Sequence, residues 1–112
     1  MLSFGGTGMG GSWEGDVNDC WKYCCVDETY MVDHLEYIVK QHNFDGVDID
    51  YKYFTHTLEE QHFFNDVTSE LQDLLPHGHL ITHAPMEGDS TYNRTYYNIL
   101  KANADIIDFI MP

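Results

Sequence analysis

Apolar and polar residues alternate at every second position between residues 44 and 54, FDGVDIDYKYF. This period is typical of a β-strand with one apolar and one polar face. The polar face carries Asp48, Asp50 and Lys52. Because like charges repel each other when they are buried, this face either meets water as a solvated edge strand or lines a site.

Strand-like and helix-like patterns alternate along the rest of the chain. Short apolar runs predict strands at residues 1–3, 80–85 and 106–111, and helical spacing predicts helices over 27–42, 57–75 and 93–102. The order strand, helix, strand, helix, strand, helix, strand predicts an α/β chain with a parallel sheet. Both a section of a (β/α) barrel and an open doubly wound sheet fit this order.

A glycine-rich loop fills residues 5–15, GGTGMGGSWEG. A phosphate loop would require a lysine after its last glycine, and this loop has none. A dinucleotide loop would open directly into a helix, and the pattern predicts none there. We therefore interpret the segment as a surface loop beside a site, and no cofactor is expected.

The charge of the chain restricts its partners. The 112 residues suit one domain, and their formal net charge is −14. Phosphate backbones and anionic membrane surfaces would be repelled, so we expect neither nucleic acid nor membrane as a partner. A neutral or cationic ligand, such as a sugar or an amino sugar, is compatible with this charge.

Three cysteines, Cys20, Cys24 and Cys25, lie in one short segment. One local disulfide, free thiols and a metal site all remain open, although a second pair of ligands at zinc-finger spacing is missing. A calcium loop on the aspartates of residues 45–50 fails the required spacing. The pair His77 and His79 is interpreted as a polar turn, and His83 as a hydrogen-bonded residue at a strand end.

Four motifs in chain order resemble glycoside hydrolase family 18, the chitinases and chitinase-like lectins. Residues 45–53, DGVDIDYKY, resemble the family signature Asp-Gly-x-Asp-x-Asp-x-Glu. Residues 3–6, SFGG, are similar to its Ser-x-Gly-Gly motif, and residues 82–85, THAP, to the end of a later strand. Residues 107–111, IDFIM, resemble the strand after that.

The resemblance implies one partial domain over residues 1–112, a section of a (β/α)₈ TIM barrel from about its third to its sixth strand. It implies that chitin or N-acetylglucosamine oligosaccharides bind at the carboxyl ends of the strands. The acetamide of the substrate is then the nucleophile. Asp50 would orient that acetamide and Asp48 would share a proton with Asp50. Gly5, Gly6, Tyr53 and Met111 would contact the substrate. It also implies an extracellular protein, although residues 1–6 do not resemble a secretory signal.

Lys52 stands where the family has its glutamic acid, which donates a proton to the glycosidic oxygen. A lysine with a pKa near 10.4 is a poor acid at neutral pH, and an ion pair with Asp50 would occupy the acetamide site. We therefore expect impaired hydrolysis, with Glu87 or Asp89 as conceivable substitutes. A lectin that binds without cleaving and an active hydrolase remain the alternatives.

Four strands of a barrel would leave two unpaired edges, and the last strand would expose apolar residues. We therefore expect this chain to be a piece of a longer protein, or to be completed by the missing barrel half or by a second copy.

Overall fold

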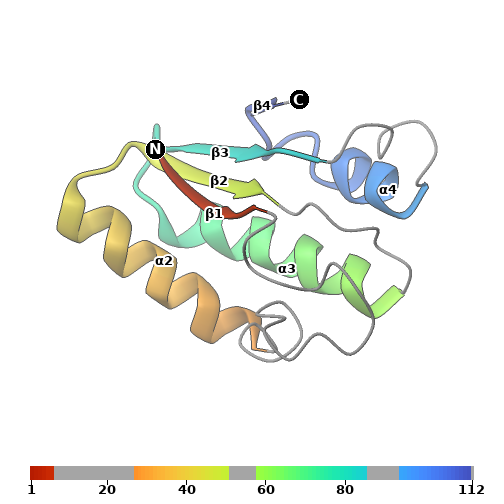
Figure 1. Cartoon of the computed structure of the whole chain (residues 1–112), viewed down its shortest axis with the longest axis horizontal. Coiled ribbons are helices and arrows are strands. Elements are labelled where there is room, and N and C mark those ends of the chain that lie inside the picture. Colours follow the sequence, from red (N-terminus) through yellow and green to blue (C-terminus); the bar gives the residue numbers. More distant parts are fainter. Residues whose placement is uncertain (7–26, 51–57, 86–93, 112) are drawn as a thin grey trace.

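The computed structural model describes residues 1–6, 27–50, 58–85 and 94–111 (Figure 1). Within these residues the chain forms four strands and three helices. In chain order they are β1 (Leu2–Gly5), α2 (Glu28–His42), β2 (Gly46–Asp50), α3 (Leu58–Leu74), β3 (Leu80–His83), α4 (Arg94–Ala102) and β4 (Phe109–Ile110).

The four strands form one parallel sheet in the order β1-β2-β3-β4, which is also their order along the chain. Figure 1 shows α2 and α3 side by side along one side of the strands, while α4 lies beyond the far end of β3. The predicted α/β chain with a parallel sheet is confirmed. No helix within the described ranges is long and apolar enough to span a bilayer.

The core lies between the sheet and the helices. Val47 and Ile49, the apolar face of β2, are fully buried, as the alternating pattern predicts. Helix α2 contributes residues of one face at helical spacing, among them Met31, Leu35 and Val39. The helices therefore cover the face of the sheet that bears Val47 and Ile49, and the acidic residues of β2 occupy the opposite face.

Helix α2 begins and ends where the sequence predicts, because both ends carry residues that cap helices. The side chain of Asp27 accepts a hydrogen bond from the Tyr30 amide at 3.1 Å. At the other end Asn43 adopts the left-handed conformation, with a φ of 55°, which asparagine tolerates better than most residues. Both caps satisfy backbone groups that the helix itself leaves unpaired.

Replacing Asp27 with alanine should destabilise the chain by about 1 kcal/mol, because the first turn of α2 would lose its cap. Urea unfolding followed by circular dichroism measures this effect. Asp27→Asn, which keeps an acceptor oxygen, serves as the control and should retain most of the stability. Equal losses in the two variants would show that the cap bond is not responsible.

The last strand is shorter than predicted. The expected strand over residues 106–111 is wrong at its start, since β4 contains only Phe109 and Ile110. The amides of Ile106 and Ile107 both donate to the carbonyl of Asn103, at 2.9 Å each, and this turn prevents an extended conformation. Asp108 then closes the turn onto β3, because its side chain accepts from the Ile81 amide at 2.8 Å.

Candidate functional site at the carboxyl ends of the strands

Several of the predicted site residues meet where β1 and β2 end. Gly5 is paired with Asp50 across the two strands, and the amide of Gly6 donates to the Asp50 carbonyl at 2.8 Å. A Cβ atom on Gly6 would lie 3.6 Å from Asp50 Oδ2, and Gly6 has a φ of +85°. The positive φ therefore favours glycine at this position, while a Cβ atom would make only an ordinary van der Waals contact with the Asp50 carboxyl group.

Met111 follows β4 at the same edge of the sheet. Its amide donates to the carbonyl of His83 at 2.8 Å, so it lies beside the end of β3. The structure thus places Gly5 and Gly6 at the end of β1, Asp50 at the end of β2 and Met111 just after β4, all at the same edge of one parallel sheet. Lys52 and Tyr53, the other predicted site residues, lie outside the described residues, as do Glu87, Asp89 and the three cysteines.

Asp48 lies in a polar row that crosses three strands. Ser3, Asp48 and Thr82 are paired at the same level of β1, β2 and β3. The Ser3 hydroxyl donates to Asp48 Oδ2 at 3.0 Å, and the Thr82 hydroxyl donates to Asp48 Oδ1 at 2.7 Å. Asp48 is only 3% exposed. Each oxygen of this buried carboxyl group therefore has a hydroxyl donor, which offsets part of the cost of burial.

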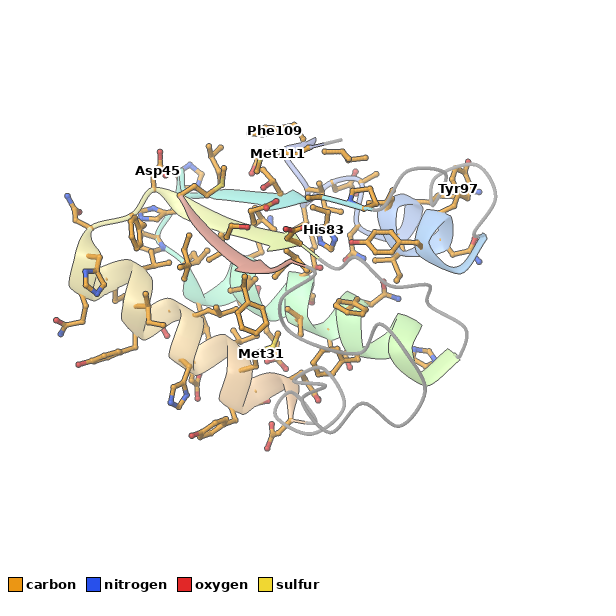
Figure 2. All side chains as sticks on the ribbon, viewed as in Figure 1. Met31, Asp45, His83, Tyr97, Phe109 and Met111 are labelled. Carbon is orange, nitrogen blue, oxygen red and sulfur yellow. The ribbon has the colours of Figure 1, made fainter. Side chains whose placement is uncertain are left out.

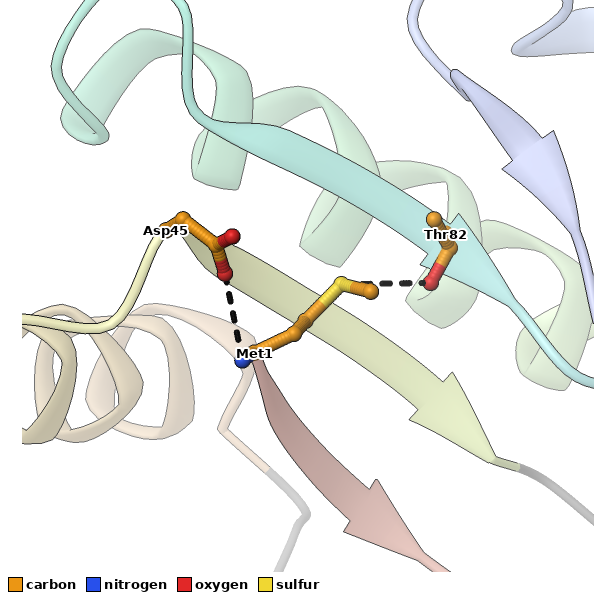
Figure 3. Close-up of polar contacts among 3 residues, drawn as sticks. All are labelled: Met1, Asp45 and Thr82. Atoms are coloured by element: carbon orange, nitrogen blue, oxygen red, sulfur yellow. Dashed lines mark hydrogen bonds and ion pairs between the residues drawn. The ribbon is translucent and has the colours of Figure 1, made fainter.

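The side chain of Met1 lies across β2 and reaches β3 (Figure 3). Its sulfur is 3.7 Å from Thr82 Oγ1, and its amino group is 3.1 Å from Asp45 Oδ1. The positive charge of this amino group, hydrogen-bonded to Asp45, lowers the pKa of the Asp45 carboxyl group. The apolar side chain of Met1 therefore lies over the polar row of Ser3, Asp48 and Thr82, on the face of the sheet opposite α2 and α3.

Replacing Thr82 with valine should destabilise the chain by about 1–3 kcal/mol, since a buried oxygen of Asp48 would lose its donor while the side-chain volume is kept. The free energy of unfolding in urea measures this. Thr29→Val is the matched control, because Thr29 is exposed and donates to Glu70 over 3.4 Å. We expect the control to change stability by less than about 0.5 kcal/mol. Equal effects in both variants would contradict the importance of the polar row.

His83 links β3 to two helices on the other face of the sheet. Figure 2 shows it on the helix side of the strand, next to α4. Its Nε2 atom lies 3.0 Å from the Thr68 hydroxyl of α3, and its Nδ1 atom lies 2.9 Å from the Tyr96 hydroxyl of α4. The Thr68 hydroxyl donates to the Phe64 carbonyl at 2.7 Å.

These contacts assign the tautomer of His83. Because the Thr68 proton points to Phe64, Nε2 of His83 must carry a proton and donate to Thr68. Nδ1 then accepts from Tyr96. Burial lowers the pKa of His83 from 6.5 to about 4, so the ring is neutral at pH 7.

The sequence indicated a hydrogen-bonded role for His83 but not its partners. Thr68 offered a signal, since it falls within the apolar stripe of α3 that also contains Phe64, Val67 and Leu71. A hydroxyl residue in such a stripe requires a buried partner. Tyr96 offered none, because tyrosines are common on both faces of helices.

The described residues contain no group of three or more histidine, cysteine or acidic side chains that could hold a metal ion. Comparisons of the chain with family models, with curated proteins and with solved structures find no match. Any function must therefore be argued from the residues of the chain and their geometry.

Proposed function

We propose that this chain is a chitinase-like domain of glycoside hydrolase family 18 that binds N-acetylglucosamine polymers and hydrolyses them poorly or not at all. The observation that carries the proposal is the arrangement around β2. Asp48 is held by hydroxyls from both neighbouring strands, and Asp50 lies two residues further along, at the end of β2 beside Gly5 and Gly6. These residues belong to two separate motifs of the resemblance.

This arrangement suits the recognition of an acetamide. Asp48 is fixed and buried, so it acts as a support for the strand end rather than as a group that meets the sugar. Asp50 is less buried than Asp48, and Gly6, which lies beside its carboxyl group, carries no side chain. In the proposed role Asp50 accepts the acetamide N–H, and Tyr53 and Met111 form part of the sugar cleft.

The sheet is proposed to be a section of a (β/α)₈ barrel, from about its third to its sixth strand. Parallel strands that follow one another in space in chain order, β1-β2-β3-β4, support this. A doubly wound sheet reverses its strand order at a switch point, and the described strands contain no reversal. In this proposal the polar row faces the inside of the barrel.

The exposed edge of β4 supports a further part of the proposal. Phe109 and Ile110 are 45% and 44% exposed, which is unusual for apolar residues of a parallel sheet. Figure 2 shows Phe109 at the outer border of the described sheet. In the proposal more strands pair along this edge, supplied by the missing barrel half or by a second copy.

Lys52 is the reason to propose weak hydrolysis. Without the glutamic acid the reaction loses its general acid, which typically contributes about 10²–10⁴-fold in rate. Attack by the acetamide forms a positively charged oxazolinium intermediate, which Asp50 would stabilise. A lysine two residues beyond Asp50 adds a positive charge that opposes this stabilisation. Binding of the neutral sugar does not require the acid, so it persists.

A fluorogenic chitooligosaccharide assay on the chain and on Lys52→Glu tests the proposed function. We expect no turnover above background by the unmodified chain, because Lys52 cannot donate the proton. Where the rest of the site is complete, Lys52→Glu should raise the rate by about 10²-fold or more. Lys52→Gln, which removes the charge without adding an acid, is the control and should stay inactive. Turnover by the unmodified chain would contradict the proposal and favour an active hydrolase.

A further inference from the structure

Helix α4 stands apart from the other two described helices. Figure 1 shows it beyond the far end of β3, outside the layer that α2 and α3 form along the strands. Its nine residues are too few for a stable helix in water, so it depends on tertiary contacts. It packs mainly against α3, and its fully buried side chains are Tyr96 and Ile99. In the turn that follows, Asn103 Nδ2 donates to Asn65 Oδ1 of α3 at 2.7 Å.

Tyr96 is the residue of α4 that reaches the sheet. Its hydroxyl donates to Nδ1 of His83 on β3 at 2.9 Å, and the centroids of the two rings are 6.0 Å apart. Its ring also stacks on Phe64 of α3, with centroids 6.4 Å apart. Nε2 of the same His83 ring donates to the Thr68 hydroxyl of α3 at 3.0 Å. One neutral imidazole ring therefore joins α4 to both β3 and α3.

The direction of these hydrogen bonds makes the junction sensitive to protonation. Nε2 of His83 already carries the proton of the neutral ring, because the Thr68 proton points to the Phe64 carbonyl. A second proton would sit on Nδ1 and point at the Tyr96 hydroxyl, which donates to that same atom in the neutral ring. Protonation would therefore break the hydrogen bond in its present direction and would also bury a positive charge.

The surroundings of His83 offer no charge that would stabilise the protonated ring. In the part of the chain that the structure describes, Thr68 of α3 and Tyr96 of α4 contact the ring nitrogens, and the strand partners of His83 are Ile49 and Ile110. Tyrosine, the titratable member of this group, is neutral in acid. Burial alone lowers the pKa of His83. The acids of α3 interact with those of α2 instead.

We propose that His83 is an acid-sensitive latch for α4: protonation of its ring releases α4 from β3 and α3, while the sheet, α2 and α3 stay folded. Release admits water to the ring, and water stabilises the charge that the docked helix excludes. The core formed by Leu35 of α2, Val47 of β2 and Leu71 of α3 holds the remaining elements together. The latch lies at the edge of the sheet where the His83 carbonyl accepts from the Met111 amide.

Amide hydrogen exchange, followed by NMR on the full chain at pH 7 and pH 4, tests the latch. After correction for the intrinsic exchange rate, exchange of the Ile99 and Leu100 amides should rise by about 10²-fold at pH 4. The reason is that a released His83 ring binds a proton near pH 6.5, while the docked ring binds it near pH 4. The Val47 and Ile49 amides of β2 should exchange more slowly than those of α4 at both pH values.

Low concentrations of urea separate release of α4 from unfolding of the whole chain, which also exposes His83. Local release exposes little surface, so exchange in α4 should not depend on urea. Exchange in β2 requires more extensive unfolding and should become faster as urea is added. A common rate and a common urea dependence for α4 and β2 at pH 4 would overturn the latch, because the chain would then open as one unit.

Three variants assign the effect to the junction. His83→Gln does not titrate, so exchange in α4 should be the same at both pH values after correction. Tyr96→Phe removes the hydroxyl that reaches Nδ1 and should raise exchange in α4 at pH 7 by about fivefold or more. Tyr97→Phe is the matched control, since this neighbouring tyrosine is 48% exposed, and it should leave exchange unchanged.

Each result decides for or against the latch. Equal exchange of the α4 amides at pH 7 and pH 4 in the unmodified chain would overturn it. A rise in acid that persists in His83→Gln would overturn it as well, because another group would then be responsible. Should His83→Gln fail to fold, the tyrosine variants still decide, since equal exchange in Tyr96→Phe and Tyr97→Phe would show that the bond to His83 does not hold α4.

Discussion

Replacing Gly46 with alanine should destabilise the chain by about 3 kcal/mol or prevent folding, although the change adds only one methyl group. A Cβ atom at this position would lie 2.2 Å from the carbonyl oxygen of Leu80 and 2.8 Å from its amide nitrogen. These are backbone atoms of β3, so no side-chain rotation can relieve the overlap. β2 and β3 would have to separate at the start of their pairing, where Gly46 faces Leu80.

Urea unfolding of Gly46→Ala measures this loss, and Gly78→Ala is the matched control. Gly78 has a φ of +90°, but a Cβ atom there would meet nothing within 4 Å. The Gly78→Ala substitution should therefore lower the free energy of unfolding by only about 1 kcal/mol, because of backbone strain. A Gly46→Ala variant as stable as the Gly78→Ala variant would show that the two strands are not packed as closely as described.

Acidification from pH 6.5 to pH 4 should lower the free energy of unfolding by about 3 kcal/mol, because His83 is buried in its neutral form. The unfolded chain binds a proton at His83 near pH 6.5, while the folded chain binds it only near pH 4. Between these values the unfolded state carries more protons, so stability falls as the pH falls. About one unit above pH 6.5, where His83 is neutral in both states, this contribution becomes constant.

Other shifted groups act differently in this window. The pKa of Asp45 is lowered, so its contribution is lost only under more acidic conditions. The pKa of Glu70 is raised, so its protonation stabilises the folded chain as the pH falls and opposes the effect of His83. Urea midpoints measured at several pH values from 7 to 4 show how the stability of the chain depends on pH. His83→Gln should be less stable at pH 7, and its stability should depend less on pH because His83 no longer titrates. An unchanged pH dependence in His83→Gln would contradict the role given to His83.

The sequence predicted β2 and α2 well, for physical reasons that are local. Strict alternation in residues 46–50 defines both faces of β2, and Asp27 and Asn43 supply the caps of α2. The error at β4 comes from contacts that are distant in sequence. Asp108 binds the Ile81 amide, 27 residues away, and no pattern near residue 108 signals this.

The candidate site was predicted in part. The motifs brought together Asp48, Asp50 and Gly6, and in the structure Asp50 and Gly6 lie at adjacent strand ends while Asp48 lies in the middle of β2. The support of Asp48 by Thr82 depends on strand register, which the sequence does not specify. The helix-side partners of His83 depend on how α3 and α4 pack, and packing follows from tertiary contacts rather than from local pattern.

An NMR titration of the chain with an N-acetylglucosamine hexamer tests the proposed function, because one experiment reports both binding and cleavage. We expect saturable shifts of the amide signals of Gly5, Gly6 and Asp50. The signal of the reducing-end sugar should keep its intensity relative to the internal sugars throughout. Absence of shifts at these residues would contradict the binding site. Growth of new reducing-end signals would contradict the impaired hydrolysis.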